Sequence, residues 1–249
     1  MRIFLTSVLF LLSFVAYGYE LKFDKVNCDI TASEDSMINA VIDYEIEFYG
    51  SVFELDEDLE IKVKLFGDFD EYKKFQKENG STASSNSGSY LGKIKTIIVY
   101  KKDGWIRTIF HEVSHRILRS AYNKPPKWIN EGLAEYFEYI EVIGGEFEVT
   151  TQSHKRKRLV RWVSEDNIDL DDFFGWTNDE WRSRSNKKNE FISSTLSWGV
   201  VYFMMQKDEN LIKKMLKSLS EKNSSKTTIN YNYPGGISDL SADINKFYK

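Results

Sequence analysis

The chain has 249 residues, and its 38 acidic and 34 basic side chains give a formal net charge of −4 at pH 7. This mildly acidic balance excludes the basic class of nucleic-acid-binding proteins. Cys28 is the only cysteine, so an intramolecular disulfide is also excluded.

Residues 1–18 have the features of a cleavable targeting segment. Arg2 supplies a positive end, residues 3–16 are almost wholly apolar, and Ala16 and Gly18 are small residues at −3 and −1 of a cut. A membrane anchor is the alternative, but the apolar run is too short to span a bilayer comfortably. We therefore predict a signal peptide at residues 1–18 and an exported mature chain, secreted or periplasmic, with no transmembrane segment.

Residues 19–122 are expected to form an α/β lobe, because apolar alternation typical of strands is interspersed with helix and turn signals. Its predicted elements are a helix starting at 33–36, a strand at 59–66, a short helix at 68–78, a loop at 80–88 and a hairpin of 89–91 with 94–100.

The next predicted helix, residues 108–118, carries the motif H-E-x-x-H. His111 and His115 are four residues apart and project from the same side, so both imidazoles can bind one metal ion. Glu112 lies about 100° further round the helix. There it flanks the ion and can take a proton from a metal-held water. The motif alone is equally compatible with two ordinary histidines and a solvated glutamate.

A second predicted helix, residues 128–137, follows the helix-stopping pair Pro125-Pro126. Glu131 and Glu135 point from one face of it. We expect Glu131 to be the third ligand, because two histidines and one glutamate form a known catalytic zinc set. We expect Glu135 to accept the second ring N–H of a ligand histidine and so fix its tautomer. The alternative is a solvated stripe of glutamates.

These two segments resemble the peptidase MA-like group of gluzincin zinc metallopeptidases, which pair H-E-x-x-H with a downstream W-x-x-E-G-x-A segment. The match is close over residues 108–137 and loose in element order over residues 59–206. Metzincins fit poorly, because Leu118 and Ala121 stand where their motif needs glycine and histidine.

The resemblance implies an α+β, zincin-like fold, with a mixed sheet before the H-E-x-x-H helix and a mainly helical lobe after it. It also implies the roles given above to Glu131 and Glu135. A sheet edge would hold the substrate backbone by strand addition, and residues 88–91 are the candidate edge. The family's tyrosine or histidine oxyanion donor is not assigned here; the candidates are Tyr90, Tyr122, Tyr136 and Tyr202.

The remaining residues, 123–249, are predicted to form the helical lobe. Its expected elements are a short strand at 147–149, helices at 189–205 and 210–219, a loop at 220–236 and a closing helix at 237–248. The basic run 154–158 could dock an acidic substrate or an anionic envelope surface. We favour a solvated helix face, because an acidic stretch follows closely.

The sequence therefore predicts an exported zinc-dependent metallopeptidase that hydrolyses peptide bonds by a zinc-activated water, with Glu112 as general base. The alternative is a catalytically inactive zincin-like protein that binds a cell-envelope partner. A third possibility is an assembly protein without a metal.

Overall fold

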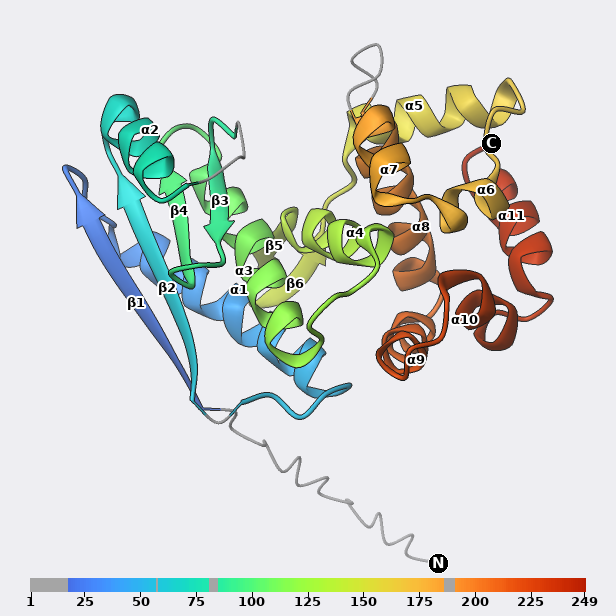
Figure 1. Cartoon of the computed structure of the whole chain (residues 1–249), viewed down its shortest axis with the longest axis horizontal. Coiled ribbons are helices and arrows are strands. Elements are labelled where there is room, and N and C mark those ends of the chain that lie inside the picture. The colour runs from blue at the N-terminus through green and yellow to red at the C-terminus, as the bar shows by residue number, and fades with distance from the viewer. Residues whose placement is uncertain (1–17, 57, 81–84, 186–190) are drawn as a thin grey trace, which may run out of the picture.

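The computed structural model describes residues 18–56, 58–80, 85–185 and 191–249, and Figure 1 shows an α+β fold with a sheet on one side and helices on the other. The predicted signal peptide lies outside the described residues except for Gly18, and the predicted loop at 80–88 does so at residues 81–84. Within the described ranges, no helix is both long enough and apolar enough to cross a bilayer.

A mixed sheet of four strands occupies the N-terminal half, in the order β1 (Tyr19–Val26), β2 (Leu59–Phe66), β4 (Thr96–Tyr100) and β3 (Gly88–Leu91). The first three run parallel, and β3 pairs antiparallel with β4 at the edge. The predicted strand at 59–66 and the predicted hairpin are confirmed. Sequence analysis missed β1, although its apolar side chains alternate with charged ones.

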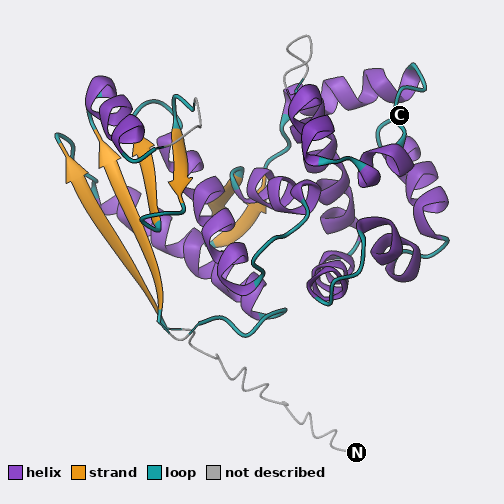
Figure 2. Ribbon diagram, in the orientation of Figure 1, coloured by secondary structure: helices purple, strands orange, loops and turns teal. Residues whose placement is uncertain are grey.

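Helices cover both faces of this sheet (Figure 2). Helices α1 (Ala32–Gly50) and α3 (Trp105–Ala121) share one apolar core with Ile97 and Val99 of β4. Helix α2 (Phe69–Glu78) supplies Tyr72 to a smaller cluster on the opposite face, where Ile98 points. This alternation is the period of two that a strand imposes on its side chains.

The start of α1 lies slightly earlier than predicted. Thr31 is the N-cap and accepts a hydrogen bond from the Glu34 backbone N–H, while the Glu34 carboxylate accepts one from the Thr31 N–H. This reciprocal capping box satisfies two backbone donors that the first turn leaves free. The helix therefore begins at Ala32, one residue before the predicted start at residues 33–36.

After α3 the chain forms α4 (Lys127–Phe137) and a hairpin of β5 (Ile140–Ile143) and β6 (Glu146–Val149). The hairpin packs back onto α1, with the Phe147 ring centroid 4.7 Å from that of Tyr44. The sheet-bearing part therefore receives a segment from beyond residue 122, where the predicted lobe boundary lies.

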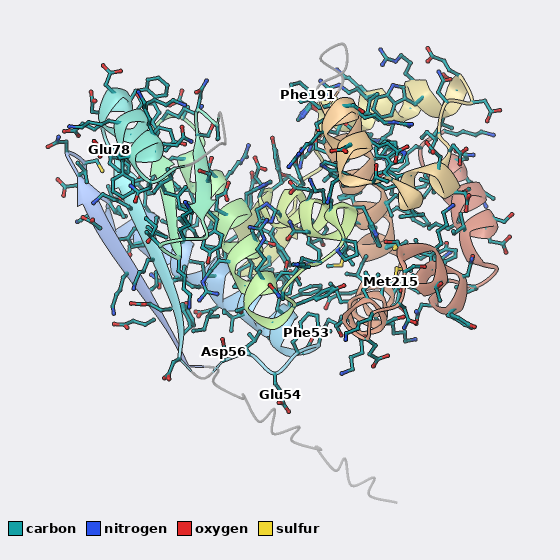
Figure 3. The ribbon with its side chains drawn as sticks, in the orientation of Figure 1. Phe53, Glu54, Asp56, Glu78, Phe191 and Met215 are labelled. Carbon is teal, nitrogen blue, oxygen red and sulfur yellow. The ribbon has the colours of Figure 1, made fainter. Side chains whose placement is uncertain are left out.

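The helical part surrounds α8 (Ile192–Lys207), in which every residue from Thr195 to Met205 is buried. Met215 of α9 is among the buried side chains packed there (Figure 3). The other helices of this part are α5 (Ser153–Ser164), α6 (Leu170–Gly175), α7 (Asn178–Ser185), α9 (Glu209–Ser220), α10 (Ser225–Asn232) and α11 (Gly236–Phe247).

The prediction of a loop throughout 220–236 is wrong, because α10 occupies part of it. Ser224 caps that helix by accepting a hydrogen bond from the Thr227 N–H, and Ile229 is fully buried. The segment is polar in composition, so the helix depends on one capping serine and one buried isoleucine rather than on a visible apolar stripe.

Candidate metal centre

Helices α3 and α4 bring the three predicted ligands together. One donor atom from each of His111, His115 and Glu131 lies within 4.8 Å of the others. His115 Nε2 is 3.8 Å from Glu131 Oε1, and the two imidazole rings are perpendicular with centroids 4.8 Å apart. Two imidazoles and one carboxylate are a donor set that suits Zn²⁺. The predicted convergence is present, and the ligand role of each residue stays a prediction.

The surroundings of the imidazoles favour a bound cation. Burial lowers the pKa of His115 in spite of the Glu131 carboxylate, so its imidazole is neutral and keeps a lone pair. Burial also acts to lower the pKa of His111, but the hydrogen bond to Glu138 and the charge of Glu112 raise it to about 10. The negative field that holds a proton on His111 would equally stabilise a metal cation.

The structure shows a hydrogen bond between His111 and a residue that sequence analysis did not name: His111 Nδ1 is 3.1 Å from Glu138 Oε2. This contact leaves Nε2 of the ring for a metal. One donor atom from each of His111, Glu135 and Glu138 lies within 4.8 Å of the others, so the supporting role of Glu135 stays a prediction. Because Glu138 is seven residues beyond Glu131, both lie on one face of α4, two helical turns apart.

Glu135 has partners of its own in α5 and at its N-cap. Its carboxylate forms a close ion pair with Lys155, whose residue exposure is 4%. Gln152 Nε2 donates to the Glu135 backbone carbonyl at 2.8 Å and to its Oε2 at 3.2 Å. The interpretation of the basic run as a solvated face is therefore wrong at Lys155, which is buried because it neutralises Glu135.

Glu112 contacts the sheet edge. The Tyr90 backbone N–H of β3 donates to Glu112 Oε2 at 2.8 Å. Strand β3 passes close to α3 because residue 88 is glycine: an added Cβ would lie 2.5 Å from Thr108 Cγ2 and 2.9 Å from the Ile98 carbonyl oxygen. The edge strand predicted at 88–91 therefore lies beside the candidate site.

Glu45 of α1 is a buried carboxylate near the site that sequence analysis missed. It is fully buried, neither carboxylate oxygen has a hydrogen-bond partner among the described residues, and the charge of His111 acts on it. Burial raises the pKa of Glu45 well above its usual value and so favours the neutral form of the carboxyl group. The sequence does contain a sign of this burial, because Glu45 falls in the apolar stripe of α1 that includes Ile38, Val41 and Ile42.

Gly132 sets the distance between α4 and α8. A Cβ on this residue would lie 2.6 Å from the Ser197 carbonyl oxygen and 2.5 Å from Val201 Cγ2. Only glycine allows this close approach of α4 to α8.

Two of the four candidate oxyanion donors are already engaged. The Tyr122 hydroxyl donates to the Leu219 carbonyl oxygen at 2.9 Å, and the Tyr202 hydroxyl bonds to Thr151 Oγ1 at 2.8 Å. Tyr136 is buried, and burial raises the pKa of its hydroxyl. Tyr90 lies nearest the site through its backbone contact with Glu112.

Comparison with known proteins adds one match. A family model described as "Protein of unknown function (DUF1570)" matches residues 105–225. No curated protein matches. The matched segment begins with α3 and ends at the first residue of α10, so it contains every residue of the candidate site except the β3 edge and Glu45.

Proposed function

We propose that this chain is an exported zinc-dependent metallopeptidase that hydrolyses peptide bonds. The observation that carries the proposal is the meeting of His111, His115 and Glu131 within 4.8 Å, with Glu112 one residue from the first ligand. His111, His115 and Glu131 would hold the ion. When bound, Zn²⁺ supplies Lewis acidity, which lowers the pKa of a water ligand toward neutrality and polarises the scissile carbonyl.

Glu112 is the general base of the proposed reaction. Its carboxylate removes a proton from the attacking water and later delivers the same proton to the leaving amine nitrogen. The hydrogen bond from the Tyr90 N–H stabilises the charged carboxylate and fixes its direction. Since that N–H belongs to the edge strand, the base lies where a substrate backbone added to β3 would pass.

Glu138 positions the ligand His111 in this proposal. The Glu138 carboxylate accepts the hydrogen bond from His111 Nδ1, so that the other ring nitrogen, Nε2, would be left to bind the ion. Glu135 acts indirectly in this proposal: its ion pair with Lys155 anchors the C-terminal half of α4 to α5.

The test is zinc content and peptide hydrolysis by the mature chain and its Glu112→Gln variant. We expect one zinc per chain in both proteins, and kcat about 10²–10⁴-fold lower in the variant, because only the proton acceptor is removed. Glu78→Gln is the control: it changes an exposed glutamate at the end of α2, far from α3 and α4 (Figure 3).

Undiminished hydrolysis by Glu112→Gln would remove this residue from the mechanism. Bound zinc without hydrolysis of any peptide would instead favour the inactive zincin-like alternative. Export is tested separately by the N-terminal sequence of the mature protein, which we expect to begin at Tyr19.

A further inference from the structure

A cavity of about 620 Å³ adjoins the candidate metal centre. The first turns of α4 form one wall through Lys127, Asn130 and Glu131, and the aromatic side chains of α6, α7 and their connection form another. Because the carboxylate of Glu131 also approaches His115, the cavity and the metal centre share this residue. A group bound in the cavity would therefore be adjacent to the reacting bond.

The wall of this cavity is cationic. It contains Arg119, one helical turn beyond His115, together with Lys124 and Lys127, and among the described residues that line it Glu131 is the only acidic one. No ion pair of these three cations occurs within the described part of the chain. The Arg119 guanidinium carbon is 6.0 Å from the centre of the Tyr90 ring, so the cationic wall continues toward the β3 edge. In a chain of net charge −4, this is a local positive field.

Asn130 adds an unsatisfied polar group to the same wall. The residue is 4% exposed, and its Oδ1 has no hydrogen-bond partner among the residues that the structure describes. A buried acceptor without a donor costs about 1–3 kcal/mol. Because Oδ1 is itself buried, a substrate amide N–H would satisfy it after the Asn130 side chain turns toward the cavity, and the adjacent peptide chain would then lie along α4.

The aromatic wall suits the aliphatic part of a side chain. Phe174, Trp176 and Trp181 line the cavity, and Lys127 Nζ lies 6.0 Å from the centre of the Trp181 ring. Aromatic faces, together with cations that have no ion pair among the described residues, fit a group with an apolar stem and an anionic tip.

The cavity at the other end of α4 has a different charge balance. It has a volume of about 380 Å³, and its cations Lys155 and Arg158 are matched by Glu135 and Glu138. Lys155 is moreover paired with Glu135. Of the two cavities, only the one at the N-terminal end of α4 has an excess of positive charge.

We propose that the cavity beside Glu131 is a subsite for an acidic side chain of the peptide substrate, next to the cleaved bond. This proposal rests on the proposed peptidase function and narrows its substrate class to acidic peptides. Arg119, Lys124 and Lys127 bind the substrate carboxylate, Asn130 accepts a backbone N–H, and the aromatic wall packs on the aliphatic stem.

The experiment compares matched fluorogenic peptides that differ only by glutamate or glutamine at each position around the cleaved bond. We expect kcat/KM for the glutamate peptide to exceed that for its glutamine isostere at least about 10-fold at one position. Arg119→Gln and Lys127→Gln should each lower this ratio toward one. Lys214→Gln, an exposed lysine of α9, is the matched control and should keep the wild-type ratio. The ratio should also fall as ionic strength rises.

Binding is measured separately from turnover, with the zinc-loaded Glu112→Gln variant and the same peptides, by calorimetry. Tighter binding of the glutamate peptide, weakened by adding Arg119→Gln, supports the subsite even if no peptide is hydrolysed, in which case the peptidase function alone fails. Peptide hydrolysis with equal kcat/KM and equal binding of both isosteres overturns the subsite and leaves the peptidase function standing.

Discussion

The two helices that carry the candidate site are held by different parts of the molecule. Helix α3 packs against both the sheet and α1, and a buried hydrogen bond of 2.7 Å joins Ser114 to the Tyr49 hydroxyl. Helix α4 packs on α8 through Gly132 and is tied to α5 by the Glu135–Lys155 pair. His111, Glu112 and His115 thus belong to the sheet-bearing part, and Glu131, the proposed third ligand, belongs to the helical part. Changes at α4 should displace Glu131 while leaving α3 in place.

The largest effect on stability is expected at Glu135, which ties α4 but not α3 to the helical part. Glu135→Gln leaves the Lys155 charge buried without a partner, which costs about 3–5 kcal/mol of unfolding free energy. Urea unfolding measures this loss. The control Glu209→Gln breaks a surface pair with Lys213, with side chains 39% and 27% exposed, and should cost less than about 1 kcal/mol. Equal losses would show that α4 does not depend on this pair.

The pH dependence of the same pair follows from the direction of the pKa shift. Burial acts to raise the pKa of Glu135, but the charges of Lys155 and His111 and the hydrogen bonds from Lys155 and Gln152 together outweigh it, so the pKa is lowered. The contribution to stability is present above about pH 4.3, the unfolded value, and is lost as the pH falls through the folded pKa. The difference in unfolding free energy between wild type and Glu135→Gln should therefore shrink as the pH is lowered.

A smaller effect is expected from a single methyl group at Gly132. In Gly132→Ala the new Cβ meets the α8 backbone at Ser197, which costs about 1–3 kcal/mol and displaces α4. Because α4 carries Glu131, this displacement should weaken zinc binding, while the far-ultraviolet circular dichroism spectrum stays close to that of the wild type. Gly92→Ala is the matched control, because no atom lies within 4 Å of its added Cβ. Wild-type melting and zinc content in Gly132→Ala would refute the close-approach argument.

The smallest expected loss of stability is at Glu138, where the substitution should change zinc affinity alone. Glu138→Gln weakens the charged hydrogen-bond acceptor of His111 Nδ1, so zinc affinity should fall about 10–100-fold with little change in stability. Competition with a chromophoric chelator measures it. Glu141→Gln, which alters a half-exposed pair with Arg107, should leave the affinity unchanged. If Glu135→Gln lowered zinc affinity more than Glu138→Gln in folded protein, the sequence-based assignment would be supported instead.

Local patterns predicted the parts of the fold in which a short segment determines its own structure. The alternation at 59–66 and the four-residue spacing of His111 and His115 both act within one strand or one helical turn. The double proline likewise marked the start of α4. Each of these signals is independent of distant residues.

Features that depend on distant residues were not predictable in this way. Whether Glu135 or Glu138 reaches His111 depends on how α4 crosses α3, and Lys155, twenty residues beyond Glu135, decides which carboxylate is already neutralised. The composition of the basic run 154–158 indicates a solvated helix face, and only the tertiary structure shows that Glu135 pairs with Lys155 in the interior. The fold class followed from local signals, whereas the support of the site followed from tertiary packing.

If the proposed site binds zinc, the division of its donors between α3 and α4 would couple folding to the supply of free metal. An ion bound by His111, His115 and Glu131 is released if either helix leaves its partner, so opening either part forfeits the whole binding energy. At free zinc 100-fold above the dissociation constant, that energy is about 2.7 kcal/mol. The resistance of the chain to unfolding and to proteolysis would then vary with the zinc concentration of the compartment around it.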